Sequence, residues 1–217
     1  MITNYIILAM ECVGTVAFAI SGSLVAISCG LDLFGVLTVG CITAVGGGIV
    51  RDLLIGNTPP QIFFNPMILL LAFLTSVIVF IISSVNAKRF AGFKKRIDGI
   101  NVFFDALGLA VFSVAGVEVA CAKGFDANPL LAIVLGLITG VGGGIFRDVF
   151  VNEKPYILTK HIYAVASIVG CCAYYFIGTY FGLKVTATVT AVAIVVLIRM
   201  LAAKFRWRLP KIKLEDE

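Results

Sequence analysis

Residues 45–52 read Val-Gly-Gly-Gly-Ile-Val-Arg-Asp, and residues 141–148 repeat them as Val-Gly-Gly-Gly-Ile-Phe-Arg-Asp. Three consecutive glycines cost a helix roughly 2–3 kcal/mol relative to alanine, and they let the backbone leave helical geometry without a steric clash. An Arg-Asp pair is costly in lipid, so it should face water, protein or a permeating species. We therefore predict that two membrane helices are interrupted at functional breaks, formed by Gly46, Gly47, Gly48, Gly142, Gly143 and Gly144.

Close helix packing followed by an interfacial ion pair is the alternative interpretation of a single copy of this motif. Duplication of the motif in related halves favours the functional break. An interrupted helix exposes carbonyl groups at the end of its first half and amide donors at the start of its second. Carbonyl groups coordinate cations and amides attract anions, so the motif alone does not decide the sign of a bound or permeating ion.

The composition is that of a membrane protein. The chain has 217 residues, of which 60% are hydrophobic and 13% charged, and its mean hydropathy is +1.08. Soluble domains are about half apolar and about a quarter charged. The net charge of +5 therefore concerns orientation in the membrane, and we expect no nucleic-acid partner.

Several apolar runs reach the roughly 20 residues that span a bilayer. Asn65-Pro66 and Asn128-Pro129 mark helix starts, because proline suits a first helical turn. The predicted fold class is an all-α integral membrane protein with seven transmembrane helices, at residues 5–27, 35–57, 67–85, 101–122, 129–150, 161–181 and 185–203.

The chain contains an internal repeat. Residues 10–32 align with residues 104–126 at an offset of 94, including Asp32 with Asp126, and the glycine motifs align at an offset of 96. Each unit has three helices, so the second unit must enter from the opposite face of the membrane. Such inverted repeats place a site between the halves, near the midplane, at interrupted helices. We predict a first three-helix repeat at 1–86, a basic cytoplasmic loop at 87–97, a second, inverted three-helix repeat at 98–182, and a seventh helix with a basic tail at 183–217.

Small residues recur at every fourth position on the first helix of each repeat. This spacing lets helix backbones approach closely in lipid. We assign a scaffold role in helix packing to the glycines of this stripe, namely Gly14, Gly22, Gly108 and Gly116.

Acidic residues outnumber basic ones in and beside the spans. Glu11 and Asp105 occupy equivalent places in the two repeats, whereas Glu118 points away from the glycine stripe. An excess of acids in a wet path of low dielectric favours cations. The alternative is that each carboxylate is protonated or paired with an arginine and seals the bundle. The candidate charged pore or gate residues are Glu11, Arg51, Asp52, Asp105, Glu118, Arg147 and Asp148.

The lysines and arginines predict the orientation of the chain. With seven spans the termini lie on opposite sides, and 14 of the 17 basic residues fall on the side of the C-terminus. Cytoplasmic loops carry this excess, so we expect the N-terminus outside and the C-terminus in the cytoplasm of a cell membrane. The basic loop and tail could also contact anionic membrane lipids, although the orientation rule explains both without any ligand.

The sequence lacks the motifs of an enzyme. It has no phosphate-binding loop, no His/Cys cluster with metal-ligand spacing and no Ser-His-Asp candidate. We predict no catalytic residues, no cofactor and no structural metal; only a transient monovalent cation is expected. Hydroxyl groups such as that of Ser21 suit helix packing or a pore lining better than nucleophilic catalysis.

The duplicated Gly-Gly-Gly-Ile-Val/Phe-Arg-Asp motif and the three-three-one helix plan resemble the trimeric intracellular cation channel family, over roughly residues 5–203. This resemblance implies a homotrimer in which each subunit has its own pore, lined by the second and fifth helices where they kink at the glycines. It also implies passive conduction of monovalent cations, chiefly potassium. Animal members use a Lys-Glu-Val stretch and a nearby arginine to hold phosphoinositide. This chain has Val117-Glu118-Val119 and Cys121 there, so we do not expect phosphoinositide gating.

The functional hypothesis is therefore a passive, potassium-permeable cation channel that self-associates as a homotrimer. Its rival is a secondary transporter of a small solute such as a neutral amino acid, because inverted repeats with interrupted helices suit alternating access equally well. A non-conducting membrane scaffold would leave the duplicated charged motifs unexplained.

Overall fold

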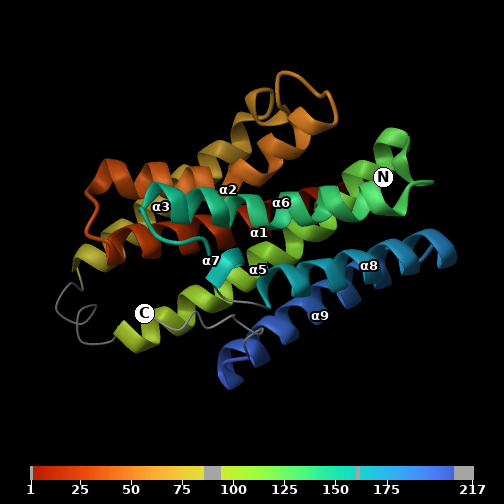
Figure 1. Cartoon of the computed structure of the whole chain (residues 1–217). Coiled ribbons are helices and arrows are strands. Elements are labelled where there is room, and N and C mark those ends of the chain that lie inside the picture. Colours follow the sequence, from red (N-terminus) through yellow and green to blue (C-terminus); the bar gives the residue numbers. More distant parts are fainter. Residues whose placement is uncertain (1, 86–93, 160–161, 208–217) are drawn as a thin grey trace, which may run out of the picture.

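The computed structural model describes residues 2–85, 94–159 and 162–207, with side chains at 8–85, 97–158 and 162–207 (Figure 1). The described chain is helical and contains no strand. Seven of its helices are long and apolar enough to cross a membrane, as predicted. They are α1 (Ile2–Ser28), α2 (Leu33–Leu54), α3 (Pro66–Val85), α5 (Lys94–Ala120), α6 (Pro129–Phe150), α8 (Tyr163–Phe181) and α9 (Lys184–Phe205).

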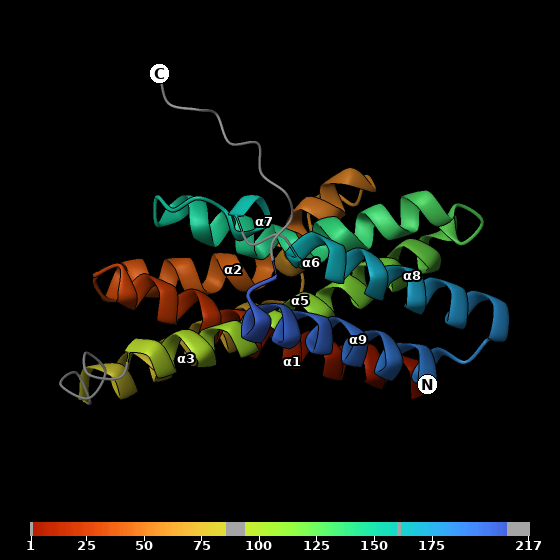
Figure 2. The same cartoon turned by 60° about the horizontal axis from the view of Figure 1, so that its bottom comes forward.

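Four helices form the centre of the bundle. α1 packs on α2 and α5, and α6 packs on the same two, so that the four helices close a ring built from both repeats. α3 covers the α1–α2 side and α8 covers the α5–α6 side (Figure 1). α9, which has no counterpart in the first repeat, lies along α5 and α8 (Figure 2). This arrangement is the predicted all-α bundle of two three-helix units and a seventh helix.

The two repeats begin their second helix in the same way. The carboxylate of Asp32 accepts a hydrogen bond from the Gly35 amide at the start of α2, and the Asn128 side chain accepts one from the Leu131 amide at the start of α6. Short polar side chains cap helix starts in this manner. Asp32 is therefore structurally equivalent to Asn128, whereas the sequence alignment pairs it with Asp126. The two extra residues of the second repeat thus lie before Asn128, next to a five-residue π-helix, η2 (Cys121–Phe125).

The glycine triplets do not interrupt their helices. α2 and α6 each continue as a single α-helix through the three glycines, so the predicted breaks, with their exposed carbonyl and amide groups, are wrong. A Cβ atom on Gly47 would lie 2.0 Å from the carbonyl oxygen of Thr139, and one on Gly143 would lie 2.0 Å from that of Thr43. The triplets instead let the two helices cross in backbone contact, which offsets the poor helix propensity of glycine.

The predicted packing glycines lie at helix–helix contacts, and two of them accept aromatic rings from the opposite repeat. A Cβ on Gly108 would lie 2.1 Å from the Phe18 ring, and one on Gly14 would lie 3.0 Å from the Phe112 ring. The two rings themselves pack at 5.3 Å between centroids. Further along the stripe, Gly22 faces Thr43 and Gly116 faces Thr139. The stripe therefore lets α1 pack closely on α5, and it also lets α1 pack on α2 and α5 pack on α6.

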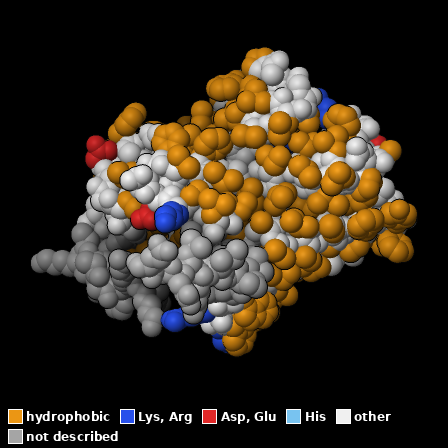
Figure 3. Space-filling model, viewed as in Figure 1, with side chains coloured by type: hydrophobic (Ala, Val, Ile, Leu, Met, Phe, Trp, Pro, Cys, Tyr) orange, Lys and Arg blue, Asp and Glu red, His pale blue; other side chains and the backbone are white. Residues whose placement is uncertain are grey.

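The outside of the bundle is apolar. Hydrophobic side chains cover most of the described surface seen in Figure 3, and the few charged ones visible there lie toward its edges. α3 shows this pattern clearly, because Leu70, Phe73, Ile78 and Ile82 are all exposed. A soluble protein rarely presents so large an apolar surface, whereas lipid-facing helices require it. The protein is a multi-pass membrane protein.

Candidate functional site in the four-helix ring

A buried ion cluster centres on Arg147 of α6, whose side chain is 0% exposed. Its Nε donates to Oδ1 of Asp148 at 2.8 Å, and its Nη1 donates to Oδ1 of Asp105 at 2.7 Å. Nη1 also donates to Oγ of Ser21 on α1 at 2.8 Å. Arg199 of α9 adds Nη2 to Oδ2 of Asp105 at 3.1 Å. Two arginines thus balance two aspartates inside the bundle.

Two tyrosines complete this cluster. The hydroxyl group of Tyr163 donates to Asp105 at 3.3 Å, and its ring lies 4.6 Å from the Arg199 guanidinium carbon. The guanidinium carbon of Arg147 lies 4.9 Å from the centroid of the Tyr156 ring. Aromatic faces attract such cations. The cluster therefore ties α1, α5, α6, α8 and α9 together, and Asp105 and Asp148 follow the predicted alternative of arginine-paired acids.

The equivalent residues of the first repeat bond differently. Nε and Nη2 of Arg51 both donate to Oδ1 of Asp52, at 3.0 and 2.7 Å. Oδ2 of Asp52 accepts the Gln61 amide at 2.9 Å, just as Oδ2 of Asp148 accepts the Tyr156 amide at 2.7 Å. Both aspartates therefore anchor the short helix that follows, η1 (Gln61–Phe63) or α7 (Tyr156–Thr159).

One cavity lies beside the C-terminal half of α2, and we call it the α2 cavity. The residues that matter in its lining are Glu11, Thr15, Gly48, Arg51, Asp52 and Phe112. It collects the predicted charged residues of the first repeat. Of the six triplet glycines, Gly48 lines the α2 cavity; the others pack against neighbouring helices or side chains.

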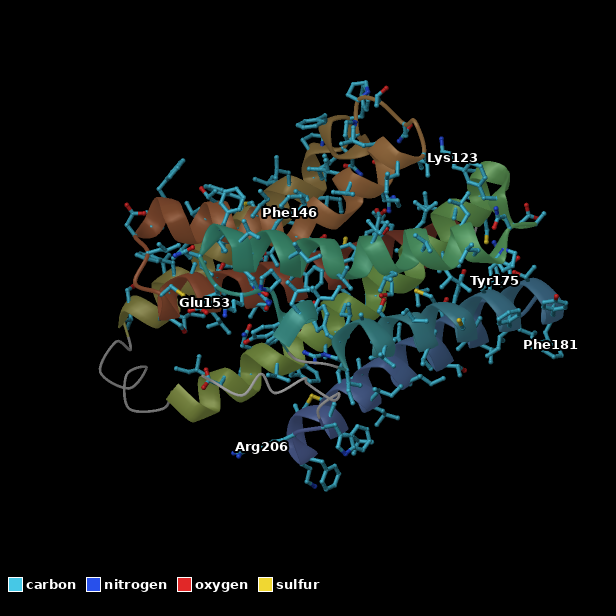
Figure 4. All side chains as sticks on the ribbon, in the orientation of Figure 1. Lys123, Phe146, Glu153, Tyr175, Phe181 and Arg206 are labelled. Carbon is cyan, nitrogen blue, oxygen red and sulfur yellow. The ribbon has the colours of Figure 1, made fainter. Side chains whose placement is uncertain are left out.

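A second cavity, the α6 cavity, lies at the C-terminal end of α6. Its lining includes Ser28, Cys29, Asp98, Asn101, Asp148 and Glu153. α2 and α6 end on opposite sides of the bundle, and Figure 4 places Glu153, after α6, far from Lys123 at the other end. Along α1 the two cavities are separated by residues 16–23, about 12 Å of helix. Phe18 and Ser21 of this segment are 1% and 0% exposed, so close side-chain packing separates the two cavities along α1.

Comparison with known proteins agrees with this architecture. A family model described as "Glycine transporter" matches residues 8–84 and again 102–179. The inner membrane protein YadS of Escherichia coli K12 is 38% identical over 95% of this chain and 96% of its own length. The membrane protein YvgT of Bacillus subtilis is 33% identical over 93% of this chain and 94% of its own.

Solved structures give the same fold. A prokaryotic TRIC channel crystallised in 0.5 M KCl is 38% identical, covers 95% of this chain and 100% of its own, and superposes with a TM-score of 0.83. The TRIC orthologue from Rhodobacter sphaeroides is 29% identical, over 93% of this chain and 99% of its own, with a TM-score of 0.82. The chain belongs to the trimeric intracellular cation channel family.

Glu118 lines neither the α2 cavity nor the α6 cavity, and it is not part of the ion cluster. Its Oε1 accepts Lys184 Nζ at 2.7 Å, and its Oε2 accepts the Tyr174 hydroxyl group. These contacts join α5 to α8 and α9. Glu118 is therefore placed as an interhelical tie, and the structure does not bring it together with the other predicted acids.

Three members of the buried cluster of this TRIC protein are not predicted from the sequence, namely Arg199, Tyr156 and Tyr163. From the sequence, Arg199 is one of the basic residues that predict the orientation of the chain. The sequence nevertheless carries a signal, because an arginine five residues before the next basic residue, in an otherwise apolar span, marks an intramembrane partner. Tyr163 carries no comparable signal, since tyrosines are common near membrane surfaces.

Proposed function

We propose that this protein is a passive monovalent-cation channel, permeable to potassium, with one pathway in each subunit. The observation that supports the proposal is the pair of cavities reaching into the four-helix ring from opposite ends. They approach the region where α2 and α6 cross at the glycine triplets. The solved relatives are described as cation channels, and this chain has the same fold.

The charges in the two cavities favour cations. In the α2 cavity, Glu11 and Asp52 face a single arginine, Arg51. In the α6 cavity, three acids accompany one lysine. Clefts with an excess of one sign raise the local concentration of the opposite ion, and acidic linings select cations. The buried Phe18 and the ion cluster of Arg147 between the cavities then form the gate region, which opens by movement at the α2–α6 crossing.

The assembly and orientation belong to the same proposal. The subunit forms a homotrimer, as its relatives' family name says of them, and its lipid-facing surface contacts membrane lipids. The N-terminus lies outside and the C-terminus in the cytoplasm, because basic residues concentrate on the C-terminal side. The α2 cavity then opens toward the outside and the α6 cavity toward the cytoplasm.

The test is planar-bilayer recording of the purified protein under a potassium chloride gradient. A channel gives discrete unitary currents that reverse near the potassium equilibrium potential. Reversal near the chloride potential would contradict the cation pathway, and silent bilayers would contradict the channel.

A second candidate function is transport of a small neutral amino acid. It rests on the family model's description as a glycine transporter and on the opposite charges of Glu11 and Arg51 in one cavity, which suit the ammonium and carboxylate groups of a zwitterion. Saturable uptake of labelled glycine into proteoliposomes, by a preparation that gives no unitary currents, would support the transporter. Unitary currents without saturable uptake would exclude it.

A further inference from the structure

Glu11 and Asp105 occupy equivalent positions in the two repeats but lie in different surroundings. Asp105 is 0% exposed and is bonded to Arg147, Arg199 and Tyr163. Glu11 is only half-buried and lines the α2 cavity. Among the described residues, none lies within hydrogen-bond or ion-pair distance of its carboxylate. The same position is thus saturated in one repeat and open in the other.

The cause of this asymmetry is the supply of cationic groups. Arg147 divides its guanidinium between Asp148 and Asp105, whereas Arg51 directs both of its bonded nitrogens to Asp52. The second cation on Asp105 comes from Arg199 of α9. The first repeat has no counterpart of α9, and none of the residues whose side chains the structure describes supplies the corresponding charge to Glu11.

A second oxygen ligand is available one helical turn further along α1. Thr15 is 0% exposed and lines the same cavity, and its Oγ1 has no hydrogen-bond partner among the described residues. Threonine hydroxyl groups within helices usually donate to the carbonyl four residues earlier, as those of Thr43 and Thr139 do here. Positions four apart share a helix face, so Glu11 and Thr15 present their oxygens to one side.

We infer that Glu11 and Thr15 form a binding site for a small monovalent cationic group, in the place that the Arg199 guanidinium takes in the second repeat. Asp52 is already used by Arg51 and by the Gln61 amide, so the cavity offers one unpaired negative charge. A single charge suits a potassium ion or the ammonium group of a small solute. The inference deepens the proposed function, because it assigns the site at which the transported species first binds.

The test is the thermal unfolding midpoint of the purified full-length protein in detergent. Potassium chloride replaces N-methyl-D-glucamine chloride at constant ionic strength in one arm, and glycine is added to the N-methyl-D-glucamine buffer in the other. A saturable rise with potassium identifies a metal cation, and one with glycine alone identifies an ammonium group. Glu11→Gln abolishes the rise in either case. The matched control is Asp126→Asn, which removes an exposed carboxylate outside the cavity and keeps the response.

Thr15→Val is a second variant, which keeps the inference testable if Glu11→Gln does not fold. It should raise the potassium or glycine concentration at half-maximal stabilisation about tenfold, because the loss of one ligand worth roughly 1.4 kcal/mol changes the affinity by that factor. A wild-type protein that responds to neither probe overturns the inference, and so do variants that respond like the wild type.

Bilayer recording separates this failure from failure of the proposed function. Unitary currents unchanged by Glu11→Gln remove the site but leave the channel. If potassium stabilises the wild type but not Glu11→Gln, and the wild type gives no unitary currents, the proposed channel function is wrong but the binding site stands.

Discussion

Arg51 and Arg147 follow the same glycine triplet, and each donates to the aspartate after it. Only Arg147 also reaches a second acid, Asp105. A buried charge is stable only when it is paired and hydrogen-bonded, so Arg147 is fixed inside the protein by two carboxylates. Arg51 has one carboxylate partner and borders a cavity. At the scale of single residues, an identical motif therefore supports a closed site in one repeat and an accessible one in the other.

The triplet glycines give a prediction at the same scale. Gly47→Ala places a Cβ 2.0 Å from the Thr139 carbonyl oxygen, so α2 and α6 must move apart. We expect a loss of about 1–3 kcal/mol in the free energy of unfolding, the usual cost of overpacking. Gly48→Ala is the matched control, because its Cβ meets nothing closer than the Arg51 guanidinium at 3.8 Å. It should be neutral or stabilising by up to about 1 kcal/mol through helix propensity.

Denaturant or thermal unfolding of both variants in one detergent decides this prediction. Equal stability of Gly47→Ala and Gly48→Ala would show that the helices do not depend on backbone contact at the crossing. If the triplet had to break the helix, Gly47→Ala and Gly48→Ala would lower the free energy of unfolding by similar amounts.

At the scale of helices, α9 is held by charge as well as by apolar packing. Arg199 inserts its guanidinium between Asp105 and the Tyr163 ring, and it is 4% exposed. A second ion pair, Lys184 with Glu118, joins the other end of α9 to α5. The Lys184 side chain is 52% exposed, so solvent screens this pair. One helix is thus docked at two points of unequal strength.

This difference predicts the effect of removing either cation. Arg199→Met leaves a buried carboxylate with one partner fewer and should cost about 3–5 kcal/mol of stability. Lys184→Met removes an exposed cation of similar length and should cost less than about 1 kcal/mol. Thermal unfolding of the two variants provides the comparison. If Lys184→Met were as damaging as Arg199→Met, the docking of α9 would not depend on the buried cluster.

At the scale of the whole molecule, orientation in the membrane is open to a direct test. Cys29 lies between α1 and α2, outside the spanning segments, and lines the α6 cavity. It is the exposed member of the six cysteines; the other five are buried or half-buried. The proposed topology puts Cys29 on the cytoplasmic side. A membrane-impermeant maleimide should therefore label it in inverted vesicles and not in spheroplasts, and mass spectrometry reports the site. Labelling in spheroplasts alone would reverse the topology.

The pH dependence of this labelling follows from the surroundings of the thiol. Burial raises the pKa of Cys29, and the negative charges of Glu153 and Asp148 raise it further. The thiolate is the reactive form, so the labelling rate should be low at pH 7 and should keep rising to a higher pH than the rate for an ordinary exposed thiol. Glu153→Gln removes one of the charges and should accelerate labelling at a fixed pH. An unchanged rate would exclude an electrostatic influence of Glu153.

The class, the number of spanning helices and the repeat could all be predicted from the sequence. Each depends on features that one dimension carries, namely the length of apolar runs, the position of basic residues and the recurrence of a motif. The contact between the glycine triplets could not be predicted, because a glycine that ends a helix and a glycine that admits a neighbouring helix look alike in sequence. Only the crossing of Gly47 with Thr139 distinguishes them.

The same limit applies to the charged residues of the candidate site. The amino-acid sequence by itself determined that Glu11 and Asp105 are equivalent acids inside the membrane. The tertiary structure decided that Asp105 is neutralised and Glu11 is open, because the deciding cation, Arg199, comes from a helix 94 residues further along the chain. Pairing of buried charges depends on distances across the bundle, and helix packing sets these distances.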